Sequence, residues 1–497
     1  MNKVLIFIVA YNAEQHIEKV LLRIPPEIFE KYNYEILIID DSSKDNTFAV
    51  ARQFQKKNTA LNIKVLYNPV NQGYGGNQKL GYQYAINHNF DAVVLLHGDG
   101  QYAPELIADI FSPLLRNEAD AVFGSRMMIK GAARKGGMPL YKFAGNKILT
   151  FLENRMLGAS LSEFHSGYRA YAVEALRRIP FQHNSPDFHF DTEIIIQLLL
   201  AGQRIHETPI PTYYGDEICH VNGIKYAWDV LVACFQSRLQ RLSILYQRKY
   251  DIDQESSHYT LKLGYESSHT RAINRIEPDS RVLDIGACEG LISGELKKKG
   301  CHVYGIDQLP VKDKANFDGY TRCDLNKPEL PHDIETYDYV LMLDIIEHLQ
   351  SPEAFMDTLR EQLKLNRATI VLTTPNIAFA IVRLQLLLGQ FNYGKAGILD
   401  ITHSRLFTFK TLRHLCDECG YIVKELKGIP VPFPKAVGNN VMGRFLIGIN
   451  KLLIKISKSL FSYQIYAELQ PTPMVENMLE HTIRTSAGSP AETDIEP

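Results

Sequence analysis

The sequence predicts an α/β protein of two domains, each built on a largely parallel β-sheet. Short apolar runs alternate with amphipathic helical patterns in two separate series along the chain. These runs are apolar throughout, which is typical of strands covered by helices on both faces of a sheet. A chain of 497 residues is long enough for two or three domains.

The first series of strands begins at residue 4. Its expected strands are residues 4–10, 35–40, 63–68, 91–96 and 120–126. Ile17, Val20 and Leu21 follow the first strand at helical spacing, and Asp45 or Asn46 can cap the helix after the second. Apolar strands separated by helices in this way indicate a parallel sheet.

The second series begins near residue 280 and has different loop chemistry. Its expected strands are residues 281–286, 302–307, 337–344 and 368–375. No repeat relates the two series, so we expect two separate domains, at residues 1–215 and 256–470. Residues 216–255 form a helical connector in which Trp228, Val232 and Phe235 share a face, and the polar tail 471–497 is expected to be disordered.

Composition limits the partners and the compartment. The formal net charge of −2 provides no basic field, so nucleic acid is not an expected partner. Seven cysteines are few and odd in number, which suits a reducing, cytoplasmic location. No apolar stretch reaches the roughly 18 residues that would predict a transmembrane helix.

Acidic side chains follow three strands of the first domain. Glu14 follows the first strand, Asp40 and Asp41 the second, and Asp99 the fourth. Ligands of open α/β sheets bind at these strand ends. Adjacent carboxylates can take ribose hydroxyls, and a carboxylate on a glycine-flanked turn can hold a divalent cation against a diphosphate. The alternative is that these acids are turn formers.

The first domain resembles the family 2 glycosyltransferases of the GT-A fold, and within them the polyprenyl- or dolichyl-phosphate sugar transferases. The resemblance covers roughly residues 1–215. It rests on IVAYNAE (8–14), IIDDSSKDNT (38–47), NQGYGGN (71–77), LLHGDGQYAPE (95–105), FGSRMM (123–128) and HSGYRAY (165–171). It implies that Asp40 and Asp41 contact the nucleoside of a nucleotide sugar, with Glu14 nearby.

The same resemblance implies a divalent metal, Mg²⁺ or Mn²⁺, held by Asp99 with help from Gln101. His97 stands where the family's DxDxQ form has its first aspartate. Imidazole is a poorer ligand for Mg²⁺ than for Mn²⁺. On the acceptor side, Arg169 can pair with an anionic phosphate, and Asp191 can act as general base for a hydroxyl. The sequence leaves open whether the acceptor is a polyprenyl phosphate or a glycan.

A glycine-bearing turn opens the second domain. Gly286 and Gly290 lie between a strand and a helix, and Asp307 ends the next strand. Glycines there let a ligand approach the backbone, and an acid at that distance can take ribose hydroxyls. Dinucleotide-binding turns are similar, but the spacing is not GxGxxG.

The second domain resembles the class I S-adenosylmethionine-dependent methyltransferases, which have a Rossmann-like fold. The resemblance covers roughly residues 256–470 and rests on VLDIGACEG (282–290), GID (305–307), RCDLN (322–326) and YDYVLMLDIIEHL (337–349). It implies that Asp284 and Gly286 belong to the first motif, that Asp307 binds the ribose, and that Asp324 lies beside the adenine.

Methyl transfer to a hydroxyl needs a base, and His348 and His403 are the candidates. The alternative for each is a packed or capping histidine.

Residues 441–461 predict an amphipathic helix. Phe445, Ile449 and Leu452 share one face, and Lys451 and Lys455 another. This pattern suits an interfacial helix at the anionic inner face of a membrane, or a helix packed on the methyltransferase.

Together these features predict a bifunctional enzyme that transfers a sugar to a lipid-phosphate or glycan acceptor and a methyl group to a substrate of the same pathway. One alternative pairs an active glycosyltransferase with a non-catalytic methyltransferase-like binding module. Another makes the first domain a non-catalytic binding module, because of His97.

Overall fold

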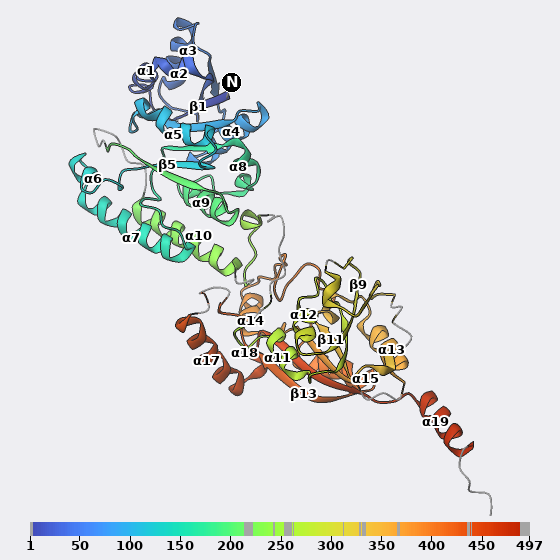
Figure 1. Cartoon of the computed structure of the whole chain (residues 1–497). Helices are drawn as coiled ribbons and strands as arrows, with labels where there is room; N and C mark the ends of the chain where they lie inside the picture. Colours follow the sequence, from blue (N-terminus) through green and yellow to red (C-terminus); the bar gives the residue numbers. More distant parts are fainter. Residues whose placement is uncertain are drawn as a thin grey trace, which may run out of the picture. The chain divides into compact units, whose positions relative to one another are not determined.

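The chain forms two compact units in a computed structural model (Figure 1). The structure describes residues 3–212, 222–241, 244–252, 261, 263–311, 313–327, 330, 334–364, 368–434, 438 and 440–487. Met1–Gln240 and Gln247–Ser256 make the first unit, and Arg241–Tyr246 and Ser257–Pro497 the second. Most of the predicted polar linker, residues 251–258, lies outside the described residues.

Seven described strands form the sheet of the first unit, in the order β3-β2-β1-β4-β6-β5-β7. They are β1 (Lys3–Ala10), β2 (Asn33–Asp40), β3 (Ile63–Tyr67), β4 (Ala92–His97), β5 (Ala121–Ser125), β6 (Arg169–Ala172) and β7 (Ile205–Pro209). Only β6 runs antiparallel to its neighbours. Ala10 pairs with Asp40 and Val9 with His97, so the carboxyl ends of β1, β2 and β4 lie side by side.

Helices cover both faces of this sheet. They are α1 (Ile17–Leu22), α2 (Pro26–Lys31), α3 (Thr47–Lys57), α4 (Tyr74–Asn87), α5 (Ile107–Leu115), α6 (Ala132–Lys135), α7 (Leu140–Leu157), α8 (Val173–Arg177), α9 (Phe190–Leu200) and α10 (Gly223–Arg241). The two faces carry separate apolar cores, as the uniformly apolar strands predict. Helix α4 lies close on the sheet, since a Cβ at Gly81 would be 2.1 Å from the Phe7 ring.

Most of the predicted helical connector, residues 216–255, is part of the first unit, whereas Arg241–Tyr246 belong to the second. Ala233 and Cys234 of α10 belong to its core, and Arg238 Nη1 donates to Met156 O of α7 at 2.8 Å. The face predicted from periodicity is not the packed one, because Trp228 is 68% and Phe235 55% exposed. Small side chains make the contact instead, since they let α10 approach the unit closely.

Seven described strands form the second sheet, in the order β10-β9-β8-β11-β12-β14-β13. They are β8 (Arg281–Ile285), β9 (His302–Asp307), β10 (Gly319–Arg322), β11 (Tyr339–Leu343), β12 (Thr369–Pro375), β13 (Tyr421–Ile429) and β14 (Gln464–Pro471). The predicted strands correspond to β8, β9, β11 and β12. Strand β14 is antiparallel to both neighbours.

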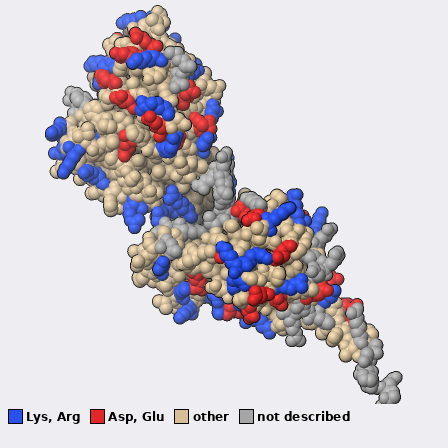
Figure 2. Space-filling view, in the orientation of Figure 1, with Lys and Arg blue, Asp and Glu red and all other residues tan. Residues whose placement is uncertain are grey.

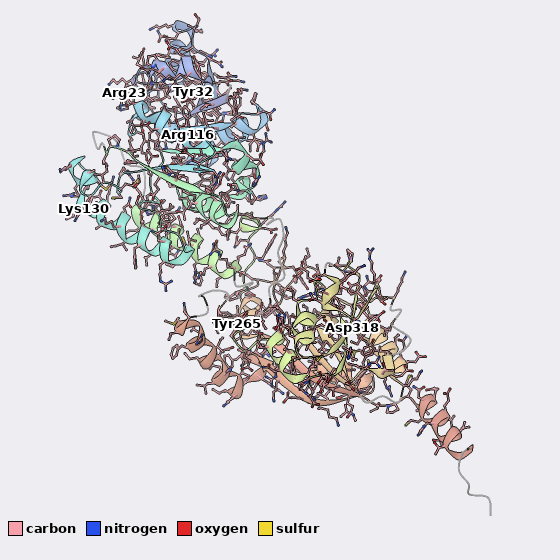
Figure 3. All side chains as sticks on the ribbon, in the orientation of Figure 1. Arg23, Tyr32, Arg116, Lys130, Tyr265 and Asp318 are labelled. Atoms are coloured by element: carbon pink, nitrogen blue, oxygen red, sulfur yellow. The ribbon has the colours of Figure 1, made fainter. Side chains whose placement is uncertain are left out.

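The helices of the second unit are α11 (Ser268–Arg275), α12 (Leu291–Lys298), α13 (Pro352–Leu363), α14 (Ala380–Leu387), α15 (Phe409–Glu418), α17 (Val441–Ile456), α18 (Lys458–Phe461) and α19 (Val475–Ala487). Surface ion pairs join some of them to the strands. Asp318, labelled in Figure 3, accepts from Lys297 Nζ of α12 at 2.7 Å.

The prediction of a disordered tail is wrong for the part that the structure describes. Residues 475–487 form α19, in which Val475, Leu479 and Ile483 are exposed apolar side chains at helical spacing. The apolar-poor composition applies to the residues after this helix, which lie outside the described part of the chain.

None of the helices in the described ranges is both long and apolar enough to cross a bilayer. Lys and Arg side chains are interspersed with Asp and Glu over the visible face of each unit (Figure 2).

Candidate active sites

The carboxyl edge of the first sheet begins with the two aspartates after β2. Asp41 is buried, and its Oδ1 accepts from Asn68 Nδ2 and from Gln72 N, both at 2.8 Å. Asp40 is 1% exposed and its Oδ1 accepts from Ser43 N at 2.9 Å. Its Oδ2 is buried with no hydrogen-bond partner among the described residues. Asp41 thus holds the neighbouring loop, while Asp40 keeps an acceptor for a ligand.

Glu14 has a structural role in this arrangement. Its two carboxylate oxygens accept from the backbone and side-chain amides of Asn46, each at 3.0 Å. Asn46 precedes α3, so Glu14 fixes the start of that helix. This is the role that the structure shows for Glu14, and its place near the nucleoside stays a prediction.

Asp99 and His97 lie on the turn that follows β4. Asp99 Oδ1 accepts from Gln101 N at 3.0 Å, which orients the carboxylate and leaves it half-exposed. His97 Nε2 is buried with no hydrogen-bond partner among the described residues. Burial lowers the pKa of His97, although the charges of Asp99 and Asp191 oppose the shift. A neutral imidazole with an unpartnered nitrogen beside a carboxylate is a suitable ligand pair for a transition metal.

Glycine at position 167 lets the acceptor-side segment approach this turn. A Cβ there would lie 2.7 Å from His97 Nε2 and 2.8 Å from the hydroxyl of Tyr74. The Tyr74 hydroxyl donates to Asp191 Oδ2 at 3.0 Å, and Gln78 Nε2 lies 3.4 Å from Oδ1. Asp191 is therefore brought to the same edge as His97, and it is 6% exposed.

The predicted role of Arg169 at an acceptor phosphate is wrong. Arg169 is 1% exposed and its guanidinium donates to the carbonyl oxygens of Phe164, Ser166 and Asp191 at 2.7, 2.7 and 2.9 Å. Its Nη1 also lies 3.6 Å from Asp191 Oδ1. The donors are spent inside the protein because β6 starts at Arg169 and points the side chain into the core. Arg169 positions Asp191 and does not meet a ligand.

Glu193, the other acid of the HFDTE segment, is held elsewhere. Its Oε1 pairs with Lys249 Nζ at 2.6 Å and its Oε2 accepts from Ser185 N at 2.6 Å. Of the two acids, Asp191 is the one at the sheet edge. Tyr74 and Gln78 are further residues of this site that the sequence did not predict, and their only signal there is two polar residues one helical turn apart in a glycine-rich segment.

The second sheet carries a glycine turn at the end of β8. Gly286 has φ +78° and donates from its N to Ile306 O at 2.7 Å. A Cβ there would lie 2.0 Å from Ile345 Cδ1, and one at Gly290 (φ +75°) 2.6 Å from the Phe317 ring. Both positions therefore require glycine, because the side chains of Ile345 and Phe317 pack directly against the backbone of the turn.

Asp307 ends β9 beside this turn and is 8% exposed. Its Oδ2 accepts from Cys288 N and its Oδ1 from Leu309 N, both at 2.8 Å. The carboxylate is thus fixed between the glycine turn and the next loop. An open pocket of about 480 Å³ begins at that loop, lined by Gln308, Leu309, Arg322, Cys323 and Asp324.

The remaining predicted ligand residues differ in their surroundings. Asp324 is exposed on the rim of this pocket, where its Oδ1 accepts from Asn326 N at 3.0 Å. Asp284 is 4% exposed and its Oδ2 accepts from Ser293 Oγ at 2.6 Å. Burial raises the pKa of Asp284 to about 6, and the charge of Asp307 adds to the shift.

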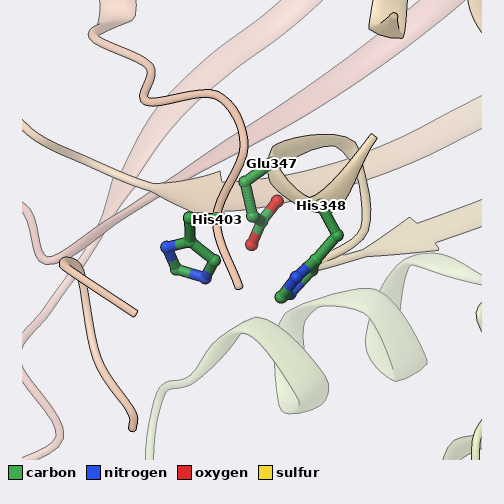
Figure 4. A group of neighbouring side chains, drawn as sticks. All are labelled: Glu347, His348 and His403. Carbon is green, nitrogen blue, oxygen red and sulfur yellow. The ribbon is translucent and has the colours of Figure 1, made fainter. Parts of the chain in front are cut away.

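His348 and His403 meet at the carboxyl edge of the second sheet. Their rings are 4.8 Å apart between centroids, and Glu347 joins them there (Figure 4). Glu347 and His348 lie in a short helical turn after β11, whereas His403 lies on the segment between α14 and α15. Burial lowers the pKa of His403. Glu347 is a further residue of this site that was not predicted from the sequence, although it immediately precedes His348.

The two sheets define a two-domain transferase in which a GT-A fold is followed by a Rossmann-like methyltransferase fold, which confirms the predicted fold class. A model of glycosyl transferase family 2 matches residues 5–179, and a methyltransferase domain model matches residues 258–426.

Two relatives agree with the first match, and one similar solved structure is reported after them. The UDP-N-acetylglucosamine–dolichyl-phosphate N-acetylglucosaminyltransferase of Methanococcus voltae is 31% identical over 222 residues, 42% of this chain and 86% of the relative. The undecaprenyl-phosphate mannosyltransferase of Micrococcus luteus is 26% identical, over 42% of this chain and 82% of the relative. The structure of glucosyl-3-phosphoglycerate synthase from Mycobacterium tuberculosis with Mn²⁺, UDP and glucosyl-3-phosphoglycerate covers 48% of this chain and 80% of that one, at 17% identity and a TM-score of 0.36.

This chain belongs to glycosyl transferase family 2, and it carries a methyltransferase domain in its second half.

Proposed function

We propose that the first unit transfers a sugar from a nucleotide sugar to a polyprenyl phosphate. The carrying observation is that Asp40 and Asp99 follow strands whose carboxyl ends share one sheet edge, to which Tyr74 and His97 bring Asp191. Two relatives that match this unit over 86% and 82% of their own length are named as transferases of dolichyl phosphate and of undecaprenyl phosphate. Asp40 Oδ2 is the acceptor offered to the nucleoside.

A divalent metal fits the residues present. Asp99 offers a carboxylate that Gln101 N has already oriented, and His97 offers a buried nitrogen without a partner among the described residues. When bound, the metal would neutralise the charge of the departing nucleoside diphosphate. The imidazole favours Mn²⁺ over Mg²⁺.

Asp191 serves the acceptor side. Tyr74 and Arg169 hold its carboxylate in place, and it is the acid at the edge that could take a proton from a hydroxyl acceptor. A phosphate acceptor is already ionised and needs no base. With a polyprenyl phosphate, Asp191 instead orients the residues around the acceptor.

The test is sugar transfer from UDP-, GDP- and TDP-sugars to a polyprenyl phosphate by the full chain. Asp99→Ala should lower the rate by about 100-fold or more, the typical cost of removing one stabilising group from a transition state. Asp109→Ala, an exposed carboxylate on α5 of the same unit, should leave the rate unchanged. A wild-type rate in Asp99→Ala would contradict the site.

The second unit, we propose, binds S-adenosylmethionine and methylates a hydroxyl in the same lipid-linked glycan pathway. Asp307 is fixed beside the Gly286 turn, and Asp324 lies on the rim of the adjoining pocket. That arrangement suits an adenosine whose ribose meets Asp307 and whose base lies in the pocket.

Methyl transfer is an in-line displacement, so positioning supplies most of the rate. The acceptor's proton must also leave, and the imidazole Nε2 of His348 or His403 could take it. Both histidines belong to the cluster at the sheet edge, and Ile345, three residues before His348, packs against Gly286 of the predicted donor turn.

Calorimetry with S-adenosylmethionine tests this part of the proposal. The wild-type chain should bind, and Asp307→Ala should bind at least about tenfold more weakly, because a ribose hydrogen bond to a charged group is worth about 1.5–3 kcal/mol. Asp318→Ala, on the surface of the same unit, is the control. Absence of binding by the wild-type chain would favour the non-catalytic binding module instead.

Helix α17 supports a peripheral contact with an anionic membrane. Gly443, Ile447 and Asn450 form its packed face. Phe445 is 62% and Leu452 61% exposed, so the predicted apolar face is not used for packing. Arg444, Met442, Lys455 and Ile456 are also exposed, which gives the helix both apolar and basic side chains for a lipid surface.

Co-sedimentation with vesicles of phosphatidylglycerol and phosphatidylcholine tests this contact. The chain should bind the anionic vesicles better, and Phe445→Ser with Leu452→Ser should reduce binding by at least about tenfold, since each apolar side chain contributes roughly 1.5–3 kcal/mol when buried. Ile422→Ser, an exposed apolar position on β13, is the control. Equal binding by all variants would contradict a role for α17.

A further inference from the structure

The strongest unassigned feature is the cluster of Glu347, His348 and His403. Its potential ligand atoms all lie within 4.8 Å of one another, and Figure 4 shows the three side chains converging. Glu347 is 1% exposed, and the two histidines are partly buried. Two imidazoles and a carboxylate form a ligand set that transition metals prefer and Mg²⁺ does not.

The hydrogen bonds of the two imidazoles fix which nitrogen is available. His348 Nδ1 lies 3.2 Å from Thr402 O, and His403 Nδ1 lies 3.0 Å from Ile398 O. A carbonyl oxygen can only accept, so each Nδ1 carries the hydrogen and each neutral ring presents the Nε2 lone pair. This is the arrangement that orients histidine ligands in metalloproteins.

Backbone contacts hold the two contributing segments together. Arg405 N donates to Glu347 O at 3.0 Å, and Ser404 Oγ lies 3.5 Å from His348 O. The cluster is therefore formed by the fold. Three ligands at about 2.0–2.1 Å from one ion stand roughly 3.3 Å apart. The ligand atoms, which lie within 4.8 Å of one another, must therefore approach by up to about 1.5 Å to hold an ion.

We propose that Glu347, His348 and His403 bind one divalent transition-metal ion of the Zn²⁺ type, with a fourth position left open. The site adjoins the predicted methyl-donor turn, because Ile345, two residues before Glu347, packs where a Gly286 Cβ would be.

Catalytic use of the ion rests on the proposed methyltransferase function. An acceptor hydroxyl in the fourth position would become more acidic and lose its proton to solvent. Its oxygen then forms the new bond to the methyl carbon as the carbon–sulfur bond breaks, and the sulfonium becomes a neutral thioether. The metal keeps its charge throughout. When the ion is bound, His348 and His403 are its ligands, and this role replaces the general-base role proposed for them above.

The test is Co²⁺ binding by the full chain, because a site with two imidazoles and a carboxylate gives Co²⁺ visible absorption bands of low coordination number. The measurement uses the Asp99→Ala variant, which removes the metal proposed for the first unit. One equivalent of Co²⁺ should produce the bands, and Zn²⁺ should displace it and abolish them. Neither readout requires S-adenosylmethionine, so failure of the methyltransferase proposal is distinguishable from failure of this one.

Adding His403→Ala or Glu347→Gln should weaken Co²⁺ and Zn²⁺ binding by more than the roughly 10- to 100-fold that loss of an outer hydrogen-bond partner costs. His414→Ala is the matched control, since His414 pairs with Glu418 at 3.3 Å on the exposed surface of the same unit. Circular dichroism of each variant reports its folding. Absence of the bands, or bands that persist in folded His403→Ala and Glu347→Gln, would overturn the site and leave the histidines as general base or packing residues.

Discussion

Replacing Gly286 by alanine tests the donor turn of the second unit. The residue has φ +78°, where an L side chain costs about 1–2 kcal/mol. A Cβ would also lie 2.0 Å from Ile345 Cδ1 and 2.4 Å from its Cγ1, and overpacking of this kind costs typically about 1–3 kcal/mol. We therefore expect Gly286→Ala to lower the free energy of unfolding of the second unit by roughly 2–5 kcal/mol.

A second glycine separates the cost of the backbone conformation from the cost of overpacking. Gly389 has φ +72° and no heavy atom within 4 Å of a built Cβ, so Gly389→Ala carries the backbone cost alone. Differential scanning calorimetry should show a fall in the melting temperature of the second unit for Gly286→Ala that is about twice that for Gly389→Ala or more. In Gly286→Ala with Ile345→Ala, the two changes should couple by about 1–3 kcal/mol.

Binding of S-adenosylmethionine is a second measurement on the same two glycine variants. Because the turn must shift to relieve the overlap, Gly286→Ala should lose S-adenosylmethionine binding in calorimetry, whereas Gly389→Ala should keep it. Equal destabilisation by the two glycine variants, or wild-type binding by Gly286→Ala, would refute the account of the turn.

Three further predictions follow from the described contacts. Burial raises the pKa of Asp284 to about 6 in the folded state, against 3.8 for an ordinary aspartate, so between these pH values the native state holds a proton that the unfolded state has lost. The free energy of unfolding should therefore fall by about 3 kcal/mol as the pH rises from below 4 to above 6. Urea unfolding of Asp284→Asn should not show this fall. Tyr74→Phe removes the hydroxyl that donates to Asp191 Oδ2 at 3.0 Å and should slow sugar transfer about 10- to 100-fold. Tyr84→Phe, which removes the hydrogen bond from another tyrosine of α4 to Glu35, should leave the rate of sugar transfer unchanged. Sugar transfer should prefer Mn²⁺ to Mg²⁺, and His97→Asp should reverse that preference; the same preference in both proteins would exclude His97 from the metal site.

Residues fixed by local backbone geometry were predictable from the sequence. The sequence shows a glycine turn between a strand and a helix, with an acid at the end of the next strand, and this pattern predicts that Asp307 lies beside the turn of Gly286. Asp307 does accept a hydrogen bond from Cys288 N of that turn. The same holds for Asp40 and Asp99, since adjacent parallel strands bring their carboxyl ends to one edge.

Residues whose role depends on tertiary contacts were not predictable. Arg169 is charged and lies in a motif, but its direction is set by where β6 enters the sheet, so its burial was not visible in the sequence. Glu14 is similar, because its partner Asn46 is distant along the chain. In α10 and α17 the apolar stripes are exposed, and small or polar residues such as Ala233 and Asn450 make the packing contacts instead. Periodicity identified both helices but not the face that each one buries.

The most direct test of the central claim is a double-label assay with the purified full-length chain, a radiolabelled nucleotide sugar, S-adenosylmethionine with a labelled methyl group, and a polyprenyl phosphate. The wild-type chain should incorporate both labels into lipid-extractable product. Asp99→Ala should lose the sugar label, and Asp307→Ala should lose only the methyl label. Sugar incorporation without any methyl label in the wild-type chain would contradict a bifunctional enzyme, and a sugar label that survives Asp99→Ala would contradict the assigned glycosyltransferase site.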